Sequence, residues 1–425
     1  MVWAERRAAA PGWPENISDI INPMKRILLI TISCAACCLS AQAQKFENLA
    51  LTPQMGWNSW NKFQGQVSEV LIREIADAMA TNGMKDAGYQ YVNIDDLWQG
   101  ERDADGNIQA DPARFPSGIK ALADYVHSKG LKLGIYSDAG TKTCGGRPGS
   151  RDHELQDAKT YAQWGVDYLK YDWCNAEGLT APEAYKKMSE ALRAAGRPVL
   201  FSLCEWGNSK PWTWARDIGH SWRTTGDIFA KFDGIIDHEG KYKDYGVLQI
   251  LDLQDGLRTY AGPGGWNDPD MLEVGNGMTV NEDRAHFTLW CMLAAPLISG
   301  NDLRHTPKET LAILTDKDII ALDQDTLGIE AFKYSAKEGV EIWFKPLARD
   351  AWGMCVLNRN TAPKEITFNW KDEVVRDDFS KREAGFDTTI YRLTDLWKKR
   401  ELGTTKKPLQ AEVPGHDVLM LRLRK

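Results

Sequence analysis

Short apolar runs alternate with amphipathic stretches from residue 54 to about residue 325. Leu71, Ile75 and Met79 follow the three-to-four-residue spacing that is typical of a helix with one buried face. The apolar runs between such stretches are read as strands. They are QMGWNSW at 54, YQYVNIDD at 89, LKLGIYSD at 131, DYLKYDW at 167, VLFSLCEW at 199, HSWRTTGD at 220, GGWNDPDML at 264 and APLISGND at 295.

Regular alternation of strand and helix predicts a parallel sheet in an α/β fold. Eight repeats favour a closed (β/α)8 TIM barrel, which we expect over residues 44–328. An open doubly wound sheet is the alternative. That fold usually carries a glycine-rich phosphate loop after its first strand, and Gly56-Trp57-Asn58 is not such a loop.

After about residue 329 the pattern changes to alternating strands without helical stripes. The runs predict a small antiparallel β-sandwich over residues 329–425. No low-complexity linker precedes it, so we expect the two domains to pack closely. The runs are EAFKYSA, VEIWFKPL, AWGMCVLNR, KEITFNW, TIYRLTDLW and HDVLMLRLR.

The N-terminus carries a separate signal. Residues 24–43 have a Lys-Arg start, an apolar run too short to span a bilayer and a small-residue end, which is the form of a secretory signal peptide. Residues 1–23 precede this second start and are read as a mis-annotated extension. We therefore expect a secreted or periplasmic protein without stable membrane insertion after cleavage. Export permits disulfides, and Cys144 and Cys174 both follow predicted strands, so they could meet at one rim.

Charge limits the partners. The chain has 52 basic and 59 acidic residues among 425, a net charge of -7, and no long runs of either sign. This balance does not indicate a basic surface for binding nucleic acid or an anionic membrane, and it favours neutral or weakly charged ligands. Tryptophan is the outlier, with 17 residues.

In a (β/α)8 barrel the active site forms at the carboxyl ends of the strands. Seven predicted strands end in a carboxylate or a tryptophan. Each has an ordinary explanation alone, as a helix cap or a rim filler. Together they suit a sugar, because carboxylates accept hydrogen bonds from vicinal hydroxyls and indole faces pack on pyranose rings. The residues at these ends are Trp57, Trp60, Asp95, Asp96, Trp98, Tyr136, Asp138, Asp172, Trp173, Glu205, Trp206, Arg223, Asp227, Trp266, Asp268 and Asp270.

A hard-metal site is the chemical competitor for so many carboxylates, with Asp95-Asp96 and Asp268-Pro269-Asp270 as candidate ligands. Lys170 and Arg223 belong to the same set, and a fixed cation would oppose a bound divalent metal. We therefore favour carbohydrate and expect neither metal nor cofactor.

Lys170 and Asp172 share one face of a strand, so both should point into the barrel mouth. Lys170 would then favour the ionised form of Asp172, which could act as a nucleophile. A buried salt bridge is the structural alternative, but it costs desolvation for little stability. Glycoside hydrolysis needs a second, protonated carboxyl group, and on these grounds Asp227 and Glu205 both remain candidates.

The blocks TPQMGWNSWNKF, YVNIDDLW, LKLGIYSDAGTKTCGGRPGS, DYLKYDWCN, SLCEWG, WRTTGDI and GGWNDPDML together resemble the melibiase-type α-galactosidases of glycoside hydrolase family 27. The resemblance implies a retaining exo-α-galactosidase, with Asp172 as the nucleophile and Asp227 as the acid/base. It also implies a Cys144–Cys174 disulfide. The implied substrate contacts are Trp60, Asp95, Asp96, Tyr136, Lys170, Glu205, Arg223 and Asp270.

Two positions bear on the sugar. Relatives that remove N-acetylgalactosamine carry small residues where this chain has Glu205-Trp206. Relatives that act on β-L-arabinopyranosides have a glutamate in place of one aspartate of the pair that here is Asp95-Asp96. The resemblance therefore favours galactose. Those two activities, and a non-catalytic galactose-binding protein, are the alternatives.

Overall fold

The computed structural model describes residues 45–425. The predicted signal peptide at 24–43 and the extension at 1–23 lie outside the described residues. Every helix within 45–425 is too short or too polar to cross a membrane.

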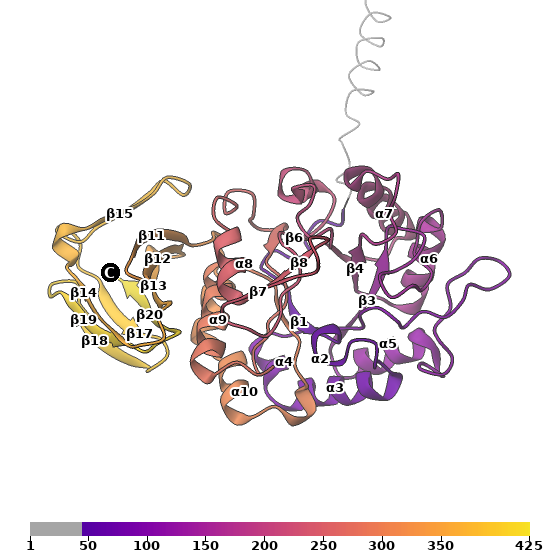
Figure 1. The fold of residues 1–425 in the computed structure, drawn as a ribbon, viewed down its shortest axis with the longest axis horizontal. Coiled ribbons are helices and arrows are strands. Elements are labelled where there is room, and N and C mark those ends of the chain that lie inside the picture. The colour runs from indigo at the N-terminus through magenta and orange to yellow at the C-terminus, as the bar shows by residue number, and fades with distance from the viewer. Residues whose placement is uncertain (1–44) are drawn as a thin grey trace, which may run out of the picture. The chain divides into compact units, whose positions relative to one another are not determined.

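Eight parallel strands form the central sheet, in the order β10-β1-β2-β3-β4-β5-β6-β9. Of these strands, β1, β3, β4 and β6 are labelled in Figure 1. Each of the eight strands lies within one of the eight predicted apolar runs, so the predicted (β/α)8 barrel is confirmed. The strands are β1 Met55–Asn58, β2 Tyr91–Asn93, β3 Lys132–Asp138, β4 Tyr168–Asp172, β5 Leu200–Leu203, β6 Ser221–Arg223, β9 Trp266–Asp268 and β10 Leu297–Ser299.

The barrel closes at a seam between the two strands that end this order, β9 and β10. Just beyond β9, Leu272 forms a parallel bridge with Ser299. The Leu272 N–H donates to the carbonyl of Ile298 at 2.8 Å. The chain segment after β9 therefore completes the ring, which brings Asp270 and its neighbours to the rim.

Helices lie between successive barrel strands, and the segment between β5 and β6 contains two short 3-10 helices, Pro211–Thr213 and Ala215–Asp217, in place of an α-helix. The predicted stripe of Leu71, Ile75 and Met79 is buried on α3, whose first turn is capped when the Ser68 hydroxyl accepts the Leu71 N–H. The α-helices are α2 Trp60–Phe63, α3 Glu69–Thr81, α4 Met84–Ala87, α5 Gly118–Ser128, α6 Glu154–Trp164, α7 Ala181–Ala195, α8 Val247–Leu253, α9 Val280–Met292, α10 Lys308–Leu314 and α11 Lys317–Asp323. A two-stranded hairpin of β7 Ile235–Asp237 and β8 Lys243–Tyr245 interrupts the segment between β6 and α8.

The C-terminal region is the predicted antiparallel sandwich. A six-stranded sheet has the order β11-β12-β13-β20-β17-β18, and β14–β19 and β15–β16 form two further pairs. Four of these strands, β15, β16, β18 and β19, were not predicted, because their alternating polar residues give no apolar run. The strands are β11 Phe332–Lys337, β12 Val340–Leu347, β13 Ala351–Asn358, β14 Lys364–Phe368, β15 Val374–Asp377, β16 Arg382–Gly385, β17 Arg392–Asp395, β18 Arg400–Thr404, β19 Leu409–Val413 and β20 Asp417–Arg424.

The six-stranded sheet is covered on both faces. Along β13, Met354 and Val356 belong to the core inside the sandwich, whereas Cys355 and Leu357 belong to the core shared with the barrel. Polar contacts cross the same junction, since the Lys345 ammonium donates to the carbonyl of Cys291 on α9 at 2.7 Å. Burial of both faces explains why β13 reads as a continuous apolar run rather than an alternating one.

Candidate active site

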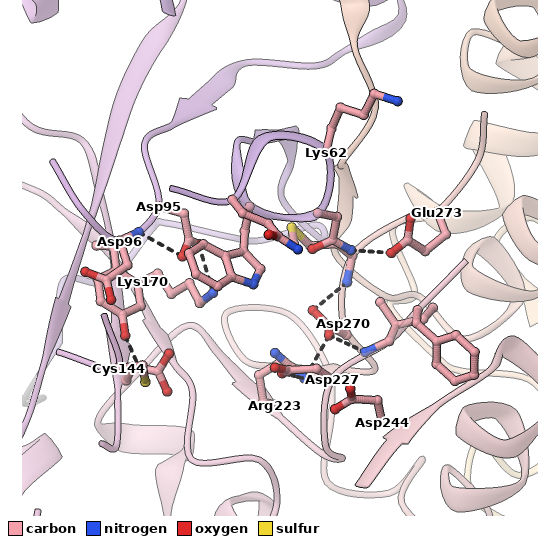
Figure 2. Close-up of a pocket in the computed structure, with 18 of the residues that line it drawn as sticks. Lys62, Asp95, Asp96, Cys144, Lys170, Arg223, Asp227, Asp244, Asp270 and Glu273 are labelled. Atoms are coloured by element: carbon pink, nitrogen blue, oxygen red, sulfur yellow. Dashed lines mark hydrogen bonds and ion pairs between the residues drawn. The ribbon is translucent and has the colours of Figure 1, made fainter. Parts of the chain in front are cut away.

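A cavity of about 460 Å³ opens at the carboxyl ends of the barrel strands (Figure 2). Nine of the ten residues predicted as catalytic or substrate-binding line it, and Glu205 is the exception. The lining residues are Trp60, Asn61, Lys62, Gln64, Asp95, Asp96, Tyr136, Cys144, Lys170, Asp172, Trp206, Arg223, Asp227, Ile228, Phe229, Ala230, Asp244, Asp270, Met271, Glu273 and Asn276.

Lys170 and Asp172 both reach the cavity from β4, as their spacing predicts. The direct ion pair of Lys170, however, is with Asp95, at 2.8 Å between Nζ and Oδ2. Burial raises the pKa of Asp172 to about 7, and the positive charge of Lys170 opposes this rise only in part. The lysine thus acts in the predicted direction, but burial outweighs it, which the sequence pattern did not reveal.

The predicted disulfide between Cys144 and Cys174 is confirmed, with 5.1 Å between the two Cα atoms. It joins the loop after β3 to the loop that follows Asp172. Asp138 braces the same loops, because its carboxylate accepts the N–H groups of Gly140 at 2.7 Å and Cys174 at 2.9 Å. Burial, aided by the charge of Asp172, raises the pKa of Asp138 to about 8.

Arg223 organises the opposite side of the cavity. Its Nη2 lies 2.8 Å from Asp227 Oδ1 and 2.8 Å from Asp270 Oδ2, and its side chain is only 5 % exposed. Burial disfavours the charge of Asp227, but the guanidinium outweighs this and the net pKa of Asp227 is lowered. The Asp227 side chain is 51 % exposed, so this carboxylate reaches the open mouth.

Four residues that follow barrel strands have left-handed backbone conformations. Their φ angles are 77° at Leu97, 50° at Asn175, 58° at Trp206 and 81° at Asp270. Such conformations cost roughly 1–3 kcal/mol each in a non-glycine residue and persist only where surrounding contacts fix them. Asp270 is fixed in this way, since its carboxylate accepts the Ile228 N–H at 2.9 Å and its carbonyl accepts the Trp290 indole N–H at 2.8 Å.

The predicted rim tryptophans differ in their surroundings. Trp173 is half-buried and stacks on Tyr185, with 5.6 Å between ring centroids. Trp60 and Trp206 line the cavity. Trp57, Trp98 and Trp266 are fully buried instead, and their indole N–H groups donate to backbone carbonyls at 2.7, 2.8 and 2.7 Å. The predicted sugar-stacking surface therefore consists of fewer indoles than the sequence pattern indicated, and the others support the loops.

Glu205 lies outside the cavity lining, and its side chain is buried. Its Oε2 accepts the Ser209 N–H at 2.7 Å. Its other oxygen has no hydrogen-bond partner, and burial raises its pKa to about 7. The left-handed turn at Trp206 presents the indole, rather than this carboxylate, to the cavity.

Several lining residues were not predicted. Asn61 and Lys62 adjoin Trp60 in the block NSWNKF, and Glu273 follows Asp270 on one loop, so proximity to predicted residues could have revealed them. The Glu273 carboxylate accepts amide N–H groups from Asn61 and Asn276, both at 2.5 Å. Burial raises its pKa to about 7.

The candidate metal ligands are engaged elsewhere, because Asp95 pairs with Lys170 and Asp270 with Arg223. Among residues 45–425, one group of potential ligands lies close together, and it consists of Asp138 and the two cysteines. The cysteine sulfurs are joined in the disulfide. The arrangement of the cavity therefore fits hydrogen bonding to hydroxyl groups better than binding of a divalent cation.

Comparison with known proteins agrees with this geometry. Residues 52–325 match the family described as Alpha galactosidase A, and residues 337–423 match the Alpha galactosidase C-terminal beta sandwich domain. The chain belongs to the melibiase-type α-galactosidase family of glycoside hydrolases.

Members of this family resemble the chain along almost its whole length. Alpha-galactosidase A of Cellvibrio japonicus is 55 % identical over 403 residues, which cover 94 % of this chain and 99 % of that protein. The crystal structure of α-galactosidase I from Mortierella vinacea superposes with a TM-score of 0.83 at 39 % identity, covering 89 % of this chain and 98 % of that one. The structure of a Saccharomyces cerevisiae α-galactosidase with raffinose superposes with a TM-score of 0.81 at 32 % identity. The match covers 90 % of this chain and 99 % of that one.

Proposed function

We propose that the protein is a retaining exo-α-galactosidase that removes terminal α-linked galactose from oligosaccharides, galactomannan or glycans. The observation that carries the proposal is the presence of two carboxylates, Asp172 and Asp227, in one cavity. Lys170 forms an ion pair there with Asp95, and Arg223 forms ion pairs with both Asp227 and Asp270. The family membership supports the activity. The raffinose complex of the yeast relative supports a galactose-containing oligosaccharide as substrate.

In the proposed reaction, Asp172 attacks the anomeric carbon while Asp227 donates a proton to the departing glycosidic oxygen. A galactosyl-enzyme forms on the Asp172 carboxylate. Water then enters, Asp227 removes its proton, and the ester bond to Asp172 breaks with net retention of configuration. The exposure of Asp227 at the mouth suits this role, because both the leaving group and the water must reach it from solvent.

The pKa directions in the free site run opposite to these roles. Burial raises the pKa of Asp172, whereas Arg223 lowers that of Asp227, and the negative charge of Asp227 contributes to the rise at Asp172. The two groups therefore titrate together, and a single shared proton favours Asp172 before substrate binds. Productive binding requires that proton on Asp227. Hydroxyl groups that donate to Asp172 would favour its ionised form and so shift the proton.

The remaining cavity residues are proposed to bind the galactose ring. Asp95 and Asp96 face the cavity from the end of β2, and Lys170 stands against both Asp95 and the ring of Tyr136, 5.3 Å from its centroid. Carboxylates accept hydrogen bonds and ammonium groups donate them. This side of the cavity can therefore both accept hydrogen bonds from adjacent sugar hydroxyls and donate hydrogen bonds to them. Trp60 offers an indole face to the C–H side of the sugar.

We further propose that the protein is exported. The sequence at residues 24–43 supports a cleaved signal peptide, and the Cys144–Cys174 disulfide is of the kind that persists in an oxidising compartment. The proposed location is the periplasm or the medium.

The decisive experiment follows hydrolysis of an aryl α-galactoside by proton NMR. We expect α-galactose as the first product, before mutarotation. β-Galactose would contradict the retaining mechanism, and no turnover would favour a galactose-binding protein. A parallel assay with aryl α-N-acetylgalactosaminide and aryl β-L-arabinopyranoside tests which sugar is preferred. If kcat/KM on either substrate exceeds that on the aryl α-galactoside, that sugar replaces galactose in the proposal.

A further inference from the structure

The β7–β8 hairpin is built into the loop that carries Asp227. The Tyr245 N–H donates to the carbonyl of Asp227 at 2.8 Å, and the Phe229 N–H donates to the carbonyl of Tyr245 at 3.1 Å. A parallel bridge also joins Ile228 to Tyr245. The base of the hairpin is therefore hydrogen-bonded to the backbone of the proposed acid/base residue.

A chain of side-chain contacts leads from the cavity to the tip of the hairpin. Asp244 lines the cavity, and Figure 2 draws it on the same side as Asp227. Its Oδ2 lies 2.8 Å from Nε2 of His238. The His238 ring stacks on Tyr242, with 4.1 Å between centroids and 17° between planes. Asp244 thus orients a stacked aromatic pair next to the cavity mouth.

The outer surface of this hairpin presents apolar and aromatic side chains among its charged ones. Tyr242 is 60 % exposed, and Ile235 and Ile236 of β7 are also exposed. Because one face of the Tyr242 ring is covered by His238, the other face is available to a ligand. An exposed aromatic ring held by a stacked partner loses little conformational freedom on binding.

The charges on the hairpin are balanced within it. Lys243 pairs with Asp237 at 3.3 Å, and Lys241 lies 3.4 Å from Glu239. No unpaired cluster of one sign remains among them to select an ionic ligand. The surface therefore combines a flat aromatic face with nearby hydrogen-bonding groups, which suits a neutral saccharide.

We propose that residues 233–245 form an outer binding site for the aglycone saccharide, the part of the substrate that remains after galactose is removed. Tyr242 stacks on a pyranose ring of that saccharide, and Asp244 and His238 hold Tyr242 in place. The inference rests on the proposed α-galactosidase activity and deepens it. The preferred substrates are then galactosylated oligosaccharides or polysaccharides rather than galactosides of small alcohols.

The test compares kcat/KM on galactomannan with kcat/KM on an aryl α-galactoside, whose small aglycone does not extend to the hairpin. Tyr242→Ala should lower the ratio of the two constants by about 3- to 10-fold, the range expected for loss of one aromatic stacking contact. Tyr242→Phe keeps the ring and should retain the wild-type ratio. Turnover of the aryl substrate by each variant shows that the protein has folded and that the proposed function holds.

Tyr260→Ala is the matched control. Tyr260 is an exposed tyrosine that precedes β9, at the opposite end of the barrel from the cavity, and its removal should leave the ratio unchanged. A wild-type ratio for Tyr242→Ala, or an equal loss in Tyr242→Phe, would overturn the inference. So would a smaller molar mass of Tyr242→Ala by light scattering, which would assign the hairpin to a contact between two copies of the chain.

Discussion

The two sides of the cavity are built differently. On the β2–β4 side, Asp172 is buried in the barrel wall, and a disulfide and the carboxylate of Asp138 hold the loop that follows it. On the β6–β9 side, Asp227 is half exposed and depends on Arg223 and a hairpin for its position. Figure 2 shows Lys170 and Cys144 on one side and Arg223 and Asp270 on the other.

This difference matches the chemistry that we propose for each side. A nucleophile must be held at a fixed place beneath the anomeric carbon, and a rigid wall provides that. An acid/base residue must meet a variable leaving group and then a water molecule, so its side needs access to solvent. The comparison teaches that one cavity can combine a fixed wall for the sugar with an adaptable wall for the aglycone.

Asp172→Asn should have the largest effect and should affect every substrate alike. We expect kcat to fall by at least about four orders of magnitude, as follows removal of the nucleophile in other covalent enzymes. The amide oxygen can still accept the Trp173 N–H that now donates to Asp172 at 2.9 Å, so the fold should persist. Steady-state kinetics on an aryl α-galactoside check this. Asp255→Asn, at an exposed carboxylate away from the cavity, is the control, and residual activity near wild type in Asp172→Asn would refute the assignment.

Asp227→Asn should lose less activity than Asp172→Asn, and the size of the loss should depend on the leaving group of the substrate. Removal of a general acid costs about 10²- to 10⁴-fold, with the greater loss on poor leaving groups that need protonation. Added azide should restore turnover of a nitrophenyl galactoside, because azide attacks the galactosyl-enzyme without a general base. The product to detect by NMR is α-galactosyl azide. Equal losses on good and poor leaving groups would show that the two sides of the cavity do not differ as described.

Removal of the disulfide should weaken the rigid side selectively. Cys144 and Cys174 are 30 residues apart, and the loss of such a cross-link costs about 3–4 kcal/mol in the free energy of unfolding. Since Cys174 lies two residues from Asp172, the double variant Cys144→Ser/Cys174→Ser should also lose kcat on every substrate. Urea unfolding and kinetics measure the two effects. A loss of kcat on galactomannan alone would contradict this prediction, because it would indicate that the variant disturbs the Asp227 side of the cavity rather than the Asp172 side.

The smallest expected effect concerns the pH dependence of stability. Burial raises the pKa of Asp172, Glu205 and Glu273 to about 7, well above the values of about 4 expected in the unfolded chain. At pH values between about 4 and 7, the folded protein therefore binds more protons than the unfolded chain. Their contribution to the free energy of unfolding is complete below about pH 4 and is lost as the pH rises through 7.

The midpoint of thermal unfolding should accordingly fall by about 2–5 °C between pH 5 and pH 8. Glu205→Gln should reduce this fall, because the amide keeps an acceptor for the Ser209 N–H and does not ionise. Glu365→Gln, at an exposed carboxylate of the sandwich, should leave the fall as it is in the wild type. Fluorimetry in matched buffers is sufficient. A midpoint that rises with pH would contradict the direction of these pKa shifts.

The barrel could be predicted from sequence because each strand is a buried run that ends in a polar or aromatic residue. The facing of Lys170 and Asp172 followed from the two-residue period of a strand. The absence of Glu205 from the cavity lining could not be predicted, because no residue pattern indicates the left-handed turn at Trp206 that follows β5. The partner of Lys170 was missed because Asp95 follows β2, which is distant in sequence from Lys170.

Asp244 could not be predicted either, since it reaches the cavity through a hairpin whose strands are short and exposed. The pKa of Asp172 depends on burial, which is a property of the folded barrel and not of neighbouring residues in the sequence. Composition and spacing thus predicted many of the residues that line the cavity. They did not determine how each residue is oriented or how strongly it is desolvated.

The shared core between α9 and the six-stranded sheet limits how the two domains can be exchanged. Trp343, Leu357 and Met420 of the sandwich belong to the same core as the barrel helices, and α9 also supplies the Trp290 indole that fixes Asp270. A barrel cut off near residue 328 would expose this apolar surface to water and loosen the helix that supports the rim. A chimera with another sandwich would therefore need a matching face toward α9 before it could be expected to bind galactose.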